Sequence, residues 1–384
     1  MKVRENTMRW RLALALGALL LGLLAGPRQG MAASQLCFPG KTQFCIAGRF
    51  LEYWQQNGGL EVFGYPLSAA QEQPNADTGQ RYLTQQFERN RFELHPENER
   101  PYDVLLGRLG ADQLRLGTGP APTFSDMEFA LPPEQRQPKD GCLWFPETRY
   151  NLCDYIGWNG PEFKLGFLSY WRAHGLREGR MDAYQRSLAL LGYPISGLFE
   201  AYNSSGDYVL IQIFERARME YHFAKPEHGV LLGRLGAEAL NPVTGWQIVR
   251  NLLPASVAVY TPVSMPGRYG RPSLFHFEPM AQGLSYTMLY QGASETDHVG
   301  LILGQGFQGW DELIPPGEGQ TEPLRIAGVE GSLSTWSRIY EETPVDVYVA
   351  RWQSGGQTYR LAAESNVMTR AEFLGLAGGL AALR

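Results

Sequence analysis

The stretch FERNRFELH at residues 87–95 decides how this chain is organised, because it returns as FERARMEYH at residues 214–222. The octet VLLGRLGA follows each copy, at residues 104–111 and again at residues 230–237. Self-similarity in the same order marks a duplicated structural unit. The sequence therefore predicts two homologous modules in one chain.

Two further matches lie upstream of each copy and extend the duplication. Gly64-Tyr65-Pro66 corresponds to Gly192-Tyr193-Pro194, and Tyr53-Trp54 corresponds to Tyr170-Trp171. The segment between the copies is rich in proline and has no hydrophobic period, which is typical of an extended, semi-rigid linker. The predicted boundaries are a signal peptide at 1–33, module 1 at 37–118, the linker at 119–141, module 2 at 142–242 and a C-terminal β-rich domain at 243–384.

Each module reads as a small α+β unit. Apolar residues at helical spacing predict a helix over 46–56. Residues 82–87 and 92–94 predict a β-hairpin around the polar turn between them. A second helix is predicted over 104–114.

The C-terminal region reads as an antiparallel sheet closed by one helix. Short apolar runs separated by glycine and proline predict strands at 284–290, 299–303, 324–329, 345–352 and 358–362. Thr369 and Glu372 form a capping box, which predicts the start of a helix. That helix is expected to contain Phe373, Leu374, Leu376 and Leu380.

The N-terminus has the three parts of a secretory signal peptide. A basic segment is followed by an apolar run over 12–25 and by small residues at 31–33. We expect cleavage near Ser34 and a secreted or cell-surface protein; the alternative is a retained anchor, although the run falls short of the roughly 20 residues of a span. The net charge is −5, and loss of residues 1–33 would make it −9. This acidity argues against a nucleic-acid partner and against anionic membranes.

The four cysteines are placed at matching positions, two at the start of each module. Because each copy should fold with its own pair, we expect disulfides Cys37–Cys45 and Cys142–Cys153. Short disulfide loops suit small exported modules. A zinc site is the alternative, but no histidine lies near either pair in sequence.

No familiar catalytic motif is found in the sequence. The zinc-protease, nucleophile-elbow, phosphate-loop and dinucleotide patterns are absent, and the six histidines are scattered. We therefore expect a non-enzymatic protein with no cofactor and no metal. One alternative is an envelope hydrolase with carboxylates in the C-terminal domain, and another is a purely structural scaffold. The residues to suspect in a hydrolase are Glu278, Glu295, Asp297 and His298.

Polar side chains repeat along the second strand of each predicted hairpin. They alternate with apolar residues and should share the outer face of the strand. One interpretation is a ligand-contact stripe in each module; the favoured one is an Arg–Glu network that braces the turn. The residues are Arg89, Arg91, Glu93 and His95 in module 1, and Arg216, Arg218, Glu220 and His222 in module 2.

The aromatic turns are the second candidate for binding. Tyr65 and Tyr193 lie in a turn before proline, and we expect them to be exposed. Exposed rings beside polar groups suit amphipathic ligands such as sugars. Trp54 and Trp171 lie on an amphipathic helix and are expected to pack in the core. The candidate ligand contacts are Tyr65, Tyr193, Arg91, Arg218, His95 and His222.

The modules resemble the LGFP-type repeat of bacterial cell-surface proteins. The resemblance covers about half of the predicted mature chain. It implies association with the cell wall or envelope, often beside a separate enzymatic domain, and hence a cell-wall or surface glycan polymer as partner. The copies depart from the family in being longer, in their disulfides and in Arg-x-Arg where the family usually has glycine. The matching residues are Tyr53-Trp54, Gly58-Gly59-Leu60, Phe63 to Ser68 and Gln85 to Glu88, then Trp171, Leu191 to Pro194 and Phe214-Glu215.

The C-terminal region is similar to sheet-plus-helix domains of bacterial envelope lipoproteins and anti-sigma-like proteins. That similarity implies an envelope location and no particular ligand.

Overall fold

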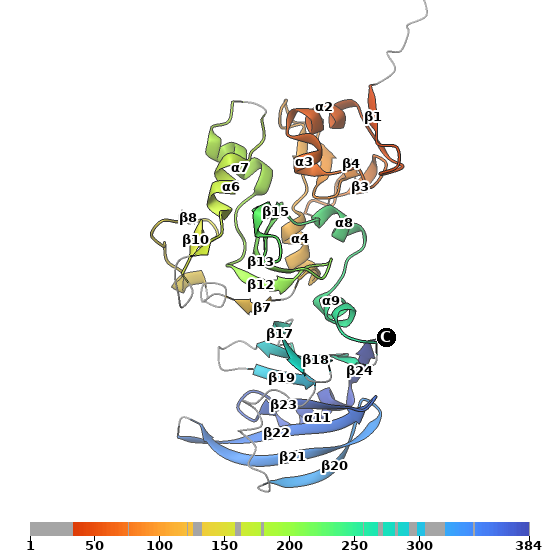
Figure 1. The fold of residues 1–384 in the computed structure, drawn as a ribbon, viewed down its shortest axis with the longest axis vertical. Helices are drawn as coiled ribbons and strands as arrows, with labels where there is room; N and C mark the ends of the chain where they lie inside the picture. The colour runs from red at the N-terminus through yellow and green to blue at the C-terminus, as the bar shows by residue number, and fades with distance from the viewer. Residues whose placement is uncertain are drawn as a thin grey trace, which may run out of the picture.

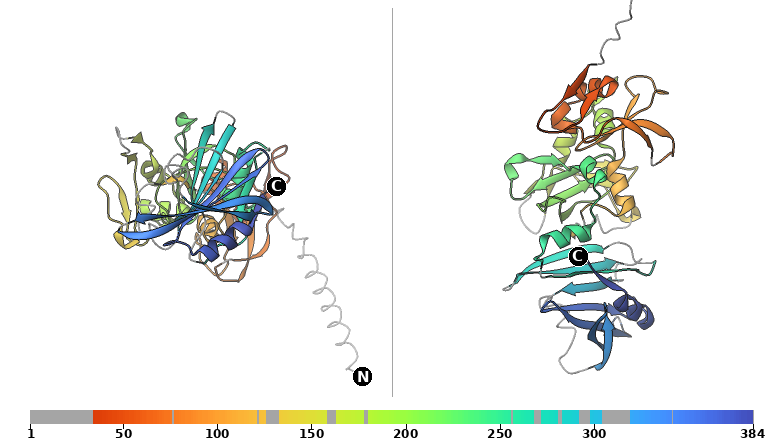
Figure 2. Two further views of the ribbon diagram at one scale, coloured as in Figure 1. Left: turned by 90° about the horizontal axis from the view of Figure 1, so that it is seen from below. Right: turned by 90° about the vertical axis from the view of Figure 1, so that its right-hand side faces the viewer.

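The chain folds as a mixed α+β protein, as the sequence predicts. Helices and antiparallel strands in several sheets make up the computed structural model. The repeated segments occupy one end of an elongated molecule and the C-terminal sheet occupies the other (Figures 1 and 2). The predicted signal peptide lies outside the described residues. These are residues 34–75, 77–120, 122–125, 133–157, 163–177, 180–255, 257–267, 272–280, 283–291, 298–303, 319–340 and 342–383.

The first repeated segment combines three short helices with a four-stranded antiparallel sheet. The predicted hairpin is confirmed as β4 and β5. The helix predicted from residue 104 begins only at Leu109, because Val104 and Leu106 pair with β5 as a strand. The elements are β1 (Gln35–Cys37), β2 (Cys45–Ala47), α2 (Gly48–Gln56), α3 (Gly59–Phe63), β3 (Gln71–Pro74), β4 (Arg81–Gln86), β5 (Arg91–Leu94), β6 (Val104–Leu106) and α4 (Leu109–Leu116).

The second repeated segment has the same order of helix, hairpin, strand and helix. Its sheet contains β12, β13, β14 and β15, with one further strand at the edge. The elements are β8 (Leu143–Phe145), β9 (Tyr150–Leu152), β10 (Tyr155–Ile156), β11 (Phe163–Lys164), α6 (Phe167–Ala173), α7 (Ala183–Leu191), β12 (Phe199–Tyr202), β13 (Tyr208–Ile213), β14 (Arg218–His222), η2 (Pro226–His228), β15 (Val230–Leu232) and α8 (Leu235–Leu240).

The matching residues occupy matching registers in the two sheets. Arg91 pairs with Gln86 at the closed end of one hairpin, and Arg218 pairs with Ile213 at the closed end of the other. Isolated bridges join Pro66 to Phe87 and Pro194 to Phe214. The repeated sequence therefore corresponds to a repeated hydrogen-bond pattern.

The segment between the repeats is not a free spacer. Its strand β7 (Pro122–Ser125) pairs with β12 and becomes the fifth strand of the second sheet. Farther along, after η1 (Pro133–Gln135), the backbone N–H of Lys139 donates to Asn151. The prolines of this segment predicted an extended linker. An extended segment can also pair with an open sheet edge, and β7 does so here.

The two repeated segments dock on each other reciprocally. The N-terminus of α4 donates backbone hydrogen bonds to the Glu215 carbonyl, from Gly110 at 3.0 Å and from Ala111 at 3.2 Å. Ala237, at the N-terminus of α8, donates to the Glu88 carbonyl at 3.1 Å. Each helix thus caps the hairpin turn of the other repeat.

The glycine in each docking helix is required by this approach. A Cβ added to Gly110 would lie 1.9 Å from the carbonyl oxygen of Phe214. A Cβ added to Gly236 would lie 1.9 Å from the carbonyl oxygen of Phe87. The octet VLLGRLGA therefore repeats in part because it forms the contact between the repeats.

The apolar core continues from one repeat into the other. A single cluster of buried residues includes Phe63 and Phe92 from the first segment together with Phe167 and Phe214 from the second. Trp54 and Trp171 belong to it, as predicted. The repeats therefore share burial as well as backbone contacts.

The C-terminal region is a seven-stranded antiparallel sheet in the order β17-β18-β19-β23-β22-β21-β20, with α11 against it. The capping box of Thr369 and Glu372 is confirmed, but Leu380 lies in β24 beyond the helix. The elements are α9 (Gly245–Leu252), β16 (Val259–Pro262), β17 (Pro272–Met280), β18 (Gly283–Gln291), β19 (His298–Leu303), β20 (Gln320–Ile326), β21 (Val329–Tyr340), β22 (Thr343–Ser354), β23 (Gln357–Glu364), α11 (Arg370–Gly378) and β24 (Leu380–Leu383). Of the helices that the structure describes, none has both the length and the apolar character of a membrane span.

Candidate functional site

A sharp turn presents the tyrosine in each repeat. Gly64 ends α3 with φ 78°, and Gly192 ends α7 with φ 79°. This left-handed conformation favours glycine. The glycines also leave room for a carboxylate, since an added Cβ would lie 2.5 Å from Glu88 Oε2 and 2.7 Å from Glu215 Cβ.

The carboxylate holds the backbone of the turn. Glu88 Oε2 accepts the backbone N–H of Tyr65 at 3.2 Å, and Glu215 Oε2 accepts that of Tyr193 at 3.3 Å. The backbone N–H groups of the same glutamates donate to the tyrosine carbonyls at 3.0 Å. Each tyrosine turn is thereby fixed to its hairpin turn on both sides.

An aromatic cluster supports each tyrosine ring from the disulfide loop. Tyr65 meets Phe38 edge to face with centroids 5.1 Å apart, and Tyr193 meets Phe145 in the same way at 5.9 Å. Both tyrosines are half-buried, whereas the sequence predicted that they are exposed. Burial raises the pKa of the Tyr193 phenol, and the negative charge of Glu147 adds to this effect.

The disulfides close the loops that carry these phenylalanines. Cys37 is bonded to Cys45 and Cys142 to Cys153, so the predicted pairing is confirmed. The described part of the chain contains no free cysteine.

A buried ionic network lies on the hairpin of the second repeat. Arg218 donates from Nε to Glu220 at 2.8 Å and from both terminal nitrogens to Glu238 at 2.8 Å. Its side chain is 1% exposed. Burial opposes the charge on Glu220, but Arg218, His222 and Asn203 outweigh it and lower the pKa of Glu220 to about 2.

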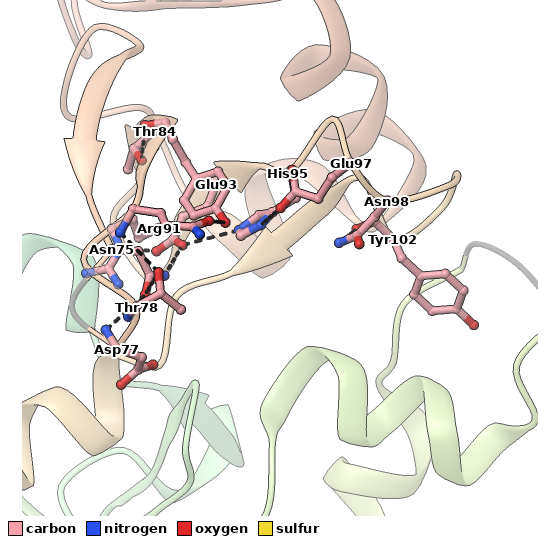
Figure 3. Close-up of polar contacts among 12 residues, drawn as sticks. Asn75, Asp77, Thr78, Thr84, Arg91, Glu93, His95, Glu97, Asn98 and Tyr102 are labelled. Atoms are coloured by element: carbon pink, nitrogen blue, oxygen red, sulfur yellow. Dashed lines mark hydrogen bonds and ion pairs between the residues drawn. The ribbon is translucent and has the colours of Figure 1, made fainter.

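The first repeat carries the same network in a more open form (Figure 3). Arg91 Nε donates to Glu93 at 2.7 Å, while its Nη1 lies 3.4 Å from Asp112. Asn75 donates to Glu93 at 2.7 Å, as Asn203 does to Glu220 at 3.0 Å. Because Arg91 is 15% exposed, water reaches this network.

His95 has a setting that its counterpart lacks. Its ring lies against that of Tyr82 with centroids 3.8 Å apart. Its Nδ1 lies 3.0 Å from Glu97 (Figure 3). Where the first repeat has Tyr82 opposite the histidine, the second has the fully buried Val209 opposite His222. The two histidines therefore meet different neighbours.

The predicted polar stripe is corrected in two respects. Arg91, Glu93 and His95 do share a face, as their second-repeat counterparts do, but that face is covered rather than outer. Helix α8 and the Asn203 turn bury Arg218, Glu220 and His222. Arg89 and Arg216 stand apart in the hairpin turns, where Arg216 lies 3.5 Å from Glu215. The Arg–Glu bracing interpretation therefore describes the geometry of Arg218 better than a ligand contact does.

Sequence reasoning missed several members of these networks. Asn75 and Asn203 precede a turn glycine in both copies, and an acidic residue follows the octet in both copies as Asp112 and Glu238. The bracing role of Glu88 and Glu215 was also missed. The recurrence of these residue types in both copies was the signal in the sequence that could have identified them.

The residues suspected in a C-terminal hydrolase are not brought together by anything the structure describes. Glu295 and Asp297 lie outside the described residues. Glu278 lies in β17 and His298 in β19, and only their backbone is described. Across the described residues, no group of three or more histidine, cysteine or acidic side chains could hold a metal ion.

Compared with known proteins, the chain matches no protein-family model, no curated protein and no solved structure.

Proposed function

We propose that this chain is a non-enzymatic extracytoplasmic protein whose two repeats bind an envelope or cell-wall polymer through Tyr65 and Tyr193. The observation that carries the proposal is the doubled tyrosine turn. In both repeats a half-buried tyrosine ring packs against a phenylalanine of the disulfide loop, and a glutamate holds the tyrosine backbone. A fixed, partly exposed phenol offers a sugar both an apolar ring face and a hydrogen-bonding hydroxyl.

The two repeats act in this proposal as copies of one module, related to LGFP-type repeats. Matching registers, matching disulfides and matching Arg–Glu–Asn contacts support that relationship. Arg218 and His222 brace the hairpin from inside. Arg91, at 15% exposure, lies nearer to solvent than Arg218, whereas His95 is as covered as His222; both Arg91 and His95 remain candidate polar contacts.

An extracytoplasmic location agrees with the disulfides. Structural disulfides persist in oxidising compartments and are rare in the cytosol. The signal-peptide pattern of the N-terminus supports the same proposal.

The test is binding of the secreted protein to isolated cell walls and to purified wall glycans. We expect Tyr65→Ala and Tyr193→Ala each to cost about 1–2 kcal/mol of binding, as aromatic anchors do at interfaces. Tyr155→Ala is the matched control, because Tyr155 is a 51% exposed tyrosine outside the two turns. Unchanged binding in the double tyrosine variant would remove this site, and absence of binding by the wild type would favour a structural scaffold.

A further inference from the structure

Each glutamate that holds a tyrosine turn is also held by the opposite repeat. Glu88 accepts Tyr65 N–H with Oε2 and accepts Arg234 Nη2 with Oε1, the latter at 3.0 Å. Arg234 belongs to the second repeat, whereas Glu88 and Tyr65 belong to the first. The carboxylate therefore links the tyrosine turn of one repeat to an arginine of the other.

The same arrangement occurs in the opposite direction. Glu215 accepts Tyr193 N–H with Oε2 and Arg108 Nη2 with Oε1, again at 3.0 Å. Arg108 and Arg234 are equivalent residues of the repeated octet. The crossing is thus reciprocal, as is the backbone docking beside it.

The position of these arginines explains why they can act on the turns. Each stands directly before a helix whose N-terminus donates to the backbone carbonyl of the same glutamate. The glutamate is therefore fixed through its backbone and its side chain by one short segment of the other repeat. Glu88 and Glu215 are mostly buried, at 20% and 17% side-chain exposure.

We infer that Arg234 positions the Tyr65 site and Arg108 positions the Tyr193 site, so that the two tyrosine sites are held at a fixed separation. This inference rests on the proposed function and names its partner more closely, as a polymer long enough to contact both turns at once. Two sites at a fixed separation raise the effective concentration of the second contact. Preorganised turns also avoid the cost of ordering the loop on binding.

The experiment is a crossed pair of variants in the full-length secreted protein. In a Tyr193→Ala background only the Tyr65 site remains, and we expect Arg234→Gln to weaken wall-glycan binding about two- to fivefold, the effect of a partly exposed charge pair. Arg108→Gln should leave binding unchanged in that background. In a Tyr65→Ala background the roles of the two arginines should exchange. A general loss of folding would weaken binding in both backgrounds and would not give this crossed pattern.

Three further variants sharpen the binding result. Arg108 also lies 3.7 Å from Asp77, so Asp77→Asn tests that contact separately and should leave binding at the Tyr193 site unchanged. Arg108→Lys and Arg234→Lys keep the positive charge and should restore part of the affinity. Equal effects of both arginines on both sites would overturn the inference.

A readout without ligand separates this inference from the proposed function. Arg234→Gln should accelerate amide hydrogen exchange in peptides that contain Tyr65 and not in those that contain Tyr193, while Arg108→Gln should do the reverse. Crossed exchange together with no effect of the tyrosines on binding would preserve the bracing and refute the binding site. Exchange that is unchanged, or raised equally in both turns, would overturn the bracing itself.

Discussion

The two repeats carry corresponding Arg–Glu–Asn networks, but the surroundings of the two networks differ. The Arg218 side chain is 1% exposed, whereas that of Arg91 is 15% exposed. The neighbours also differ, because Gln113 of the first repeat accepts a hydrogen bond from Arg218 at 3.2 Å. The position equivalent to Gln113 in the second repeat is Ala239, which offers Arg91 no such amide.

This difference shows that a duplicated motif can contribute differently to the free energy of unfolding in its two copies. Burial strengthens an ion pair only where every charge is matched, because removal of one partner then leaves a charge without water. The second network has two carboxylates on one arginine inside the protein. It should therefore be the more sensitive of the two to the same substitution.

Replacement of the arginine gives the largest expected contrast between the repeats. Arg218→Met leaves Glu220 and Glu238 buried beside each other, and we expect a loss of about 3–5 kcal/mol in the free energy of unfolding. Arg91→Met should cost less, about 1–2 kcal/mol, because its partner Asp112 is 16% exposed and Glu93 keeps a hydrogen bond from Asn75. Urea unfolding of both variants measures the difference. Equal losses would show that the exposure of the network does not decide its contribution.

Gly110 and Gly236 test the reciprocal contact, a feature that the two repeats share. Gly110→Ala and Gly236→Ala should each cost roughly 2–3 kcal/mol, because the new methyl group meets a backbone carbonyl of the other repeat. Gly375→Ala is the control, since its Cβ would meet nothing within 4 Å. Thermal unfolding gives the comparison, and full stability of both docking variants would contradict the reciprocal contact.

Acid should remove the advantage of the buried network. Glu220→Gln should cost about 2 kcal/mol at neutral pH, the size of a hydrogen bond to a charged group. The pKa of Glu220 is lowered to about 2 in the folded protein, so its stabilisation is present above the unfolded pKa and is lost as pH falls toward 2. The gap in stability between wild type and variant should narrow between about pH 5 and pH 2. The exposed Glu72→Gln should show no such gap in the same titration.

The tryptophans give the smallest expected contrast. Trp54 Nε1 donates to the Gly64 carbonyl at 3.2 Å, whereas Trp171 Nε1 has no hydrogen-bond partner within the described residues. Replacement by phenylalanine removes the same atoms from both cores. Trp54→Phe should therefore cost about 1 kcal/mol more than Trp171→Phe in urea unfolding. A larger loss for Trp171→Phe would contradict a stabilising role of the Trp54 hydrogen bond.

Local sequence patterns predicted much of this fold, whereas few of its long-range contacts were predicted. Hairpins, disulfides and the capping box at Thr369 depend on neighbours in sequence, and all three are confirmed. Strand β21 was missed because its serine and threonine residues break the apolar run that marks a strand. The helix predicted from residue 104 was wrong in its first turn, because pairing with β5 outweighed helical periodicity.

The candidate site shows the same limit. Alternation placed Arg91, Glu93 and His95 on one face, but alternation does not reveal what covers a face. The partner of Glu88 lies 146 residues away, and only the assembled pair of repeats brings Arg234 to it. Repetition of the octet was visible in the sequence, while its role in joining the two copies was not.

The reciprocal docking also affects how the chain folds during its synthesis. The hairpin turn at Glu88 is synthesised first, whereas the helix that caps it, which includes Ala237, is synthesised much later. Contacts so distant in sequence close slowly, because a long loop must be ordered before they form. Until residue 237 appears, the first repeat exposes an incomplete surface that a second emerging chain could satisfy. Crowded expression should therefore favour exchanged dimers in which α8 of one chain caps the hairpin of another.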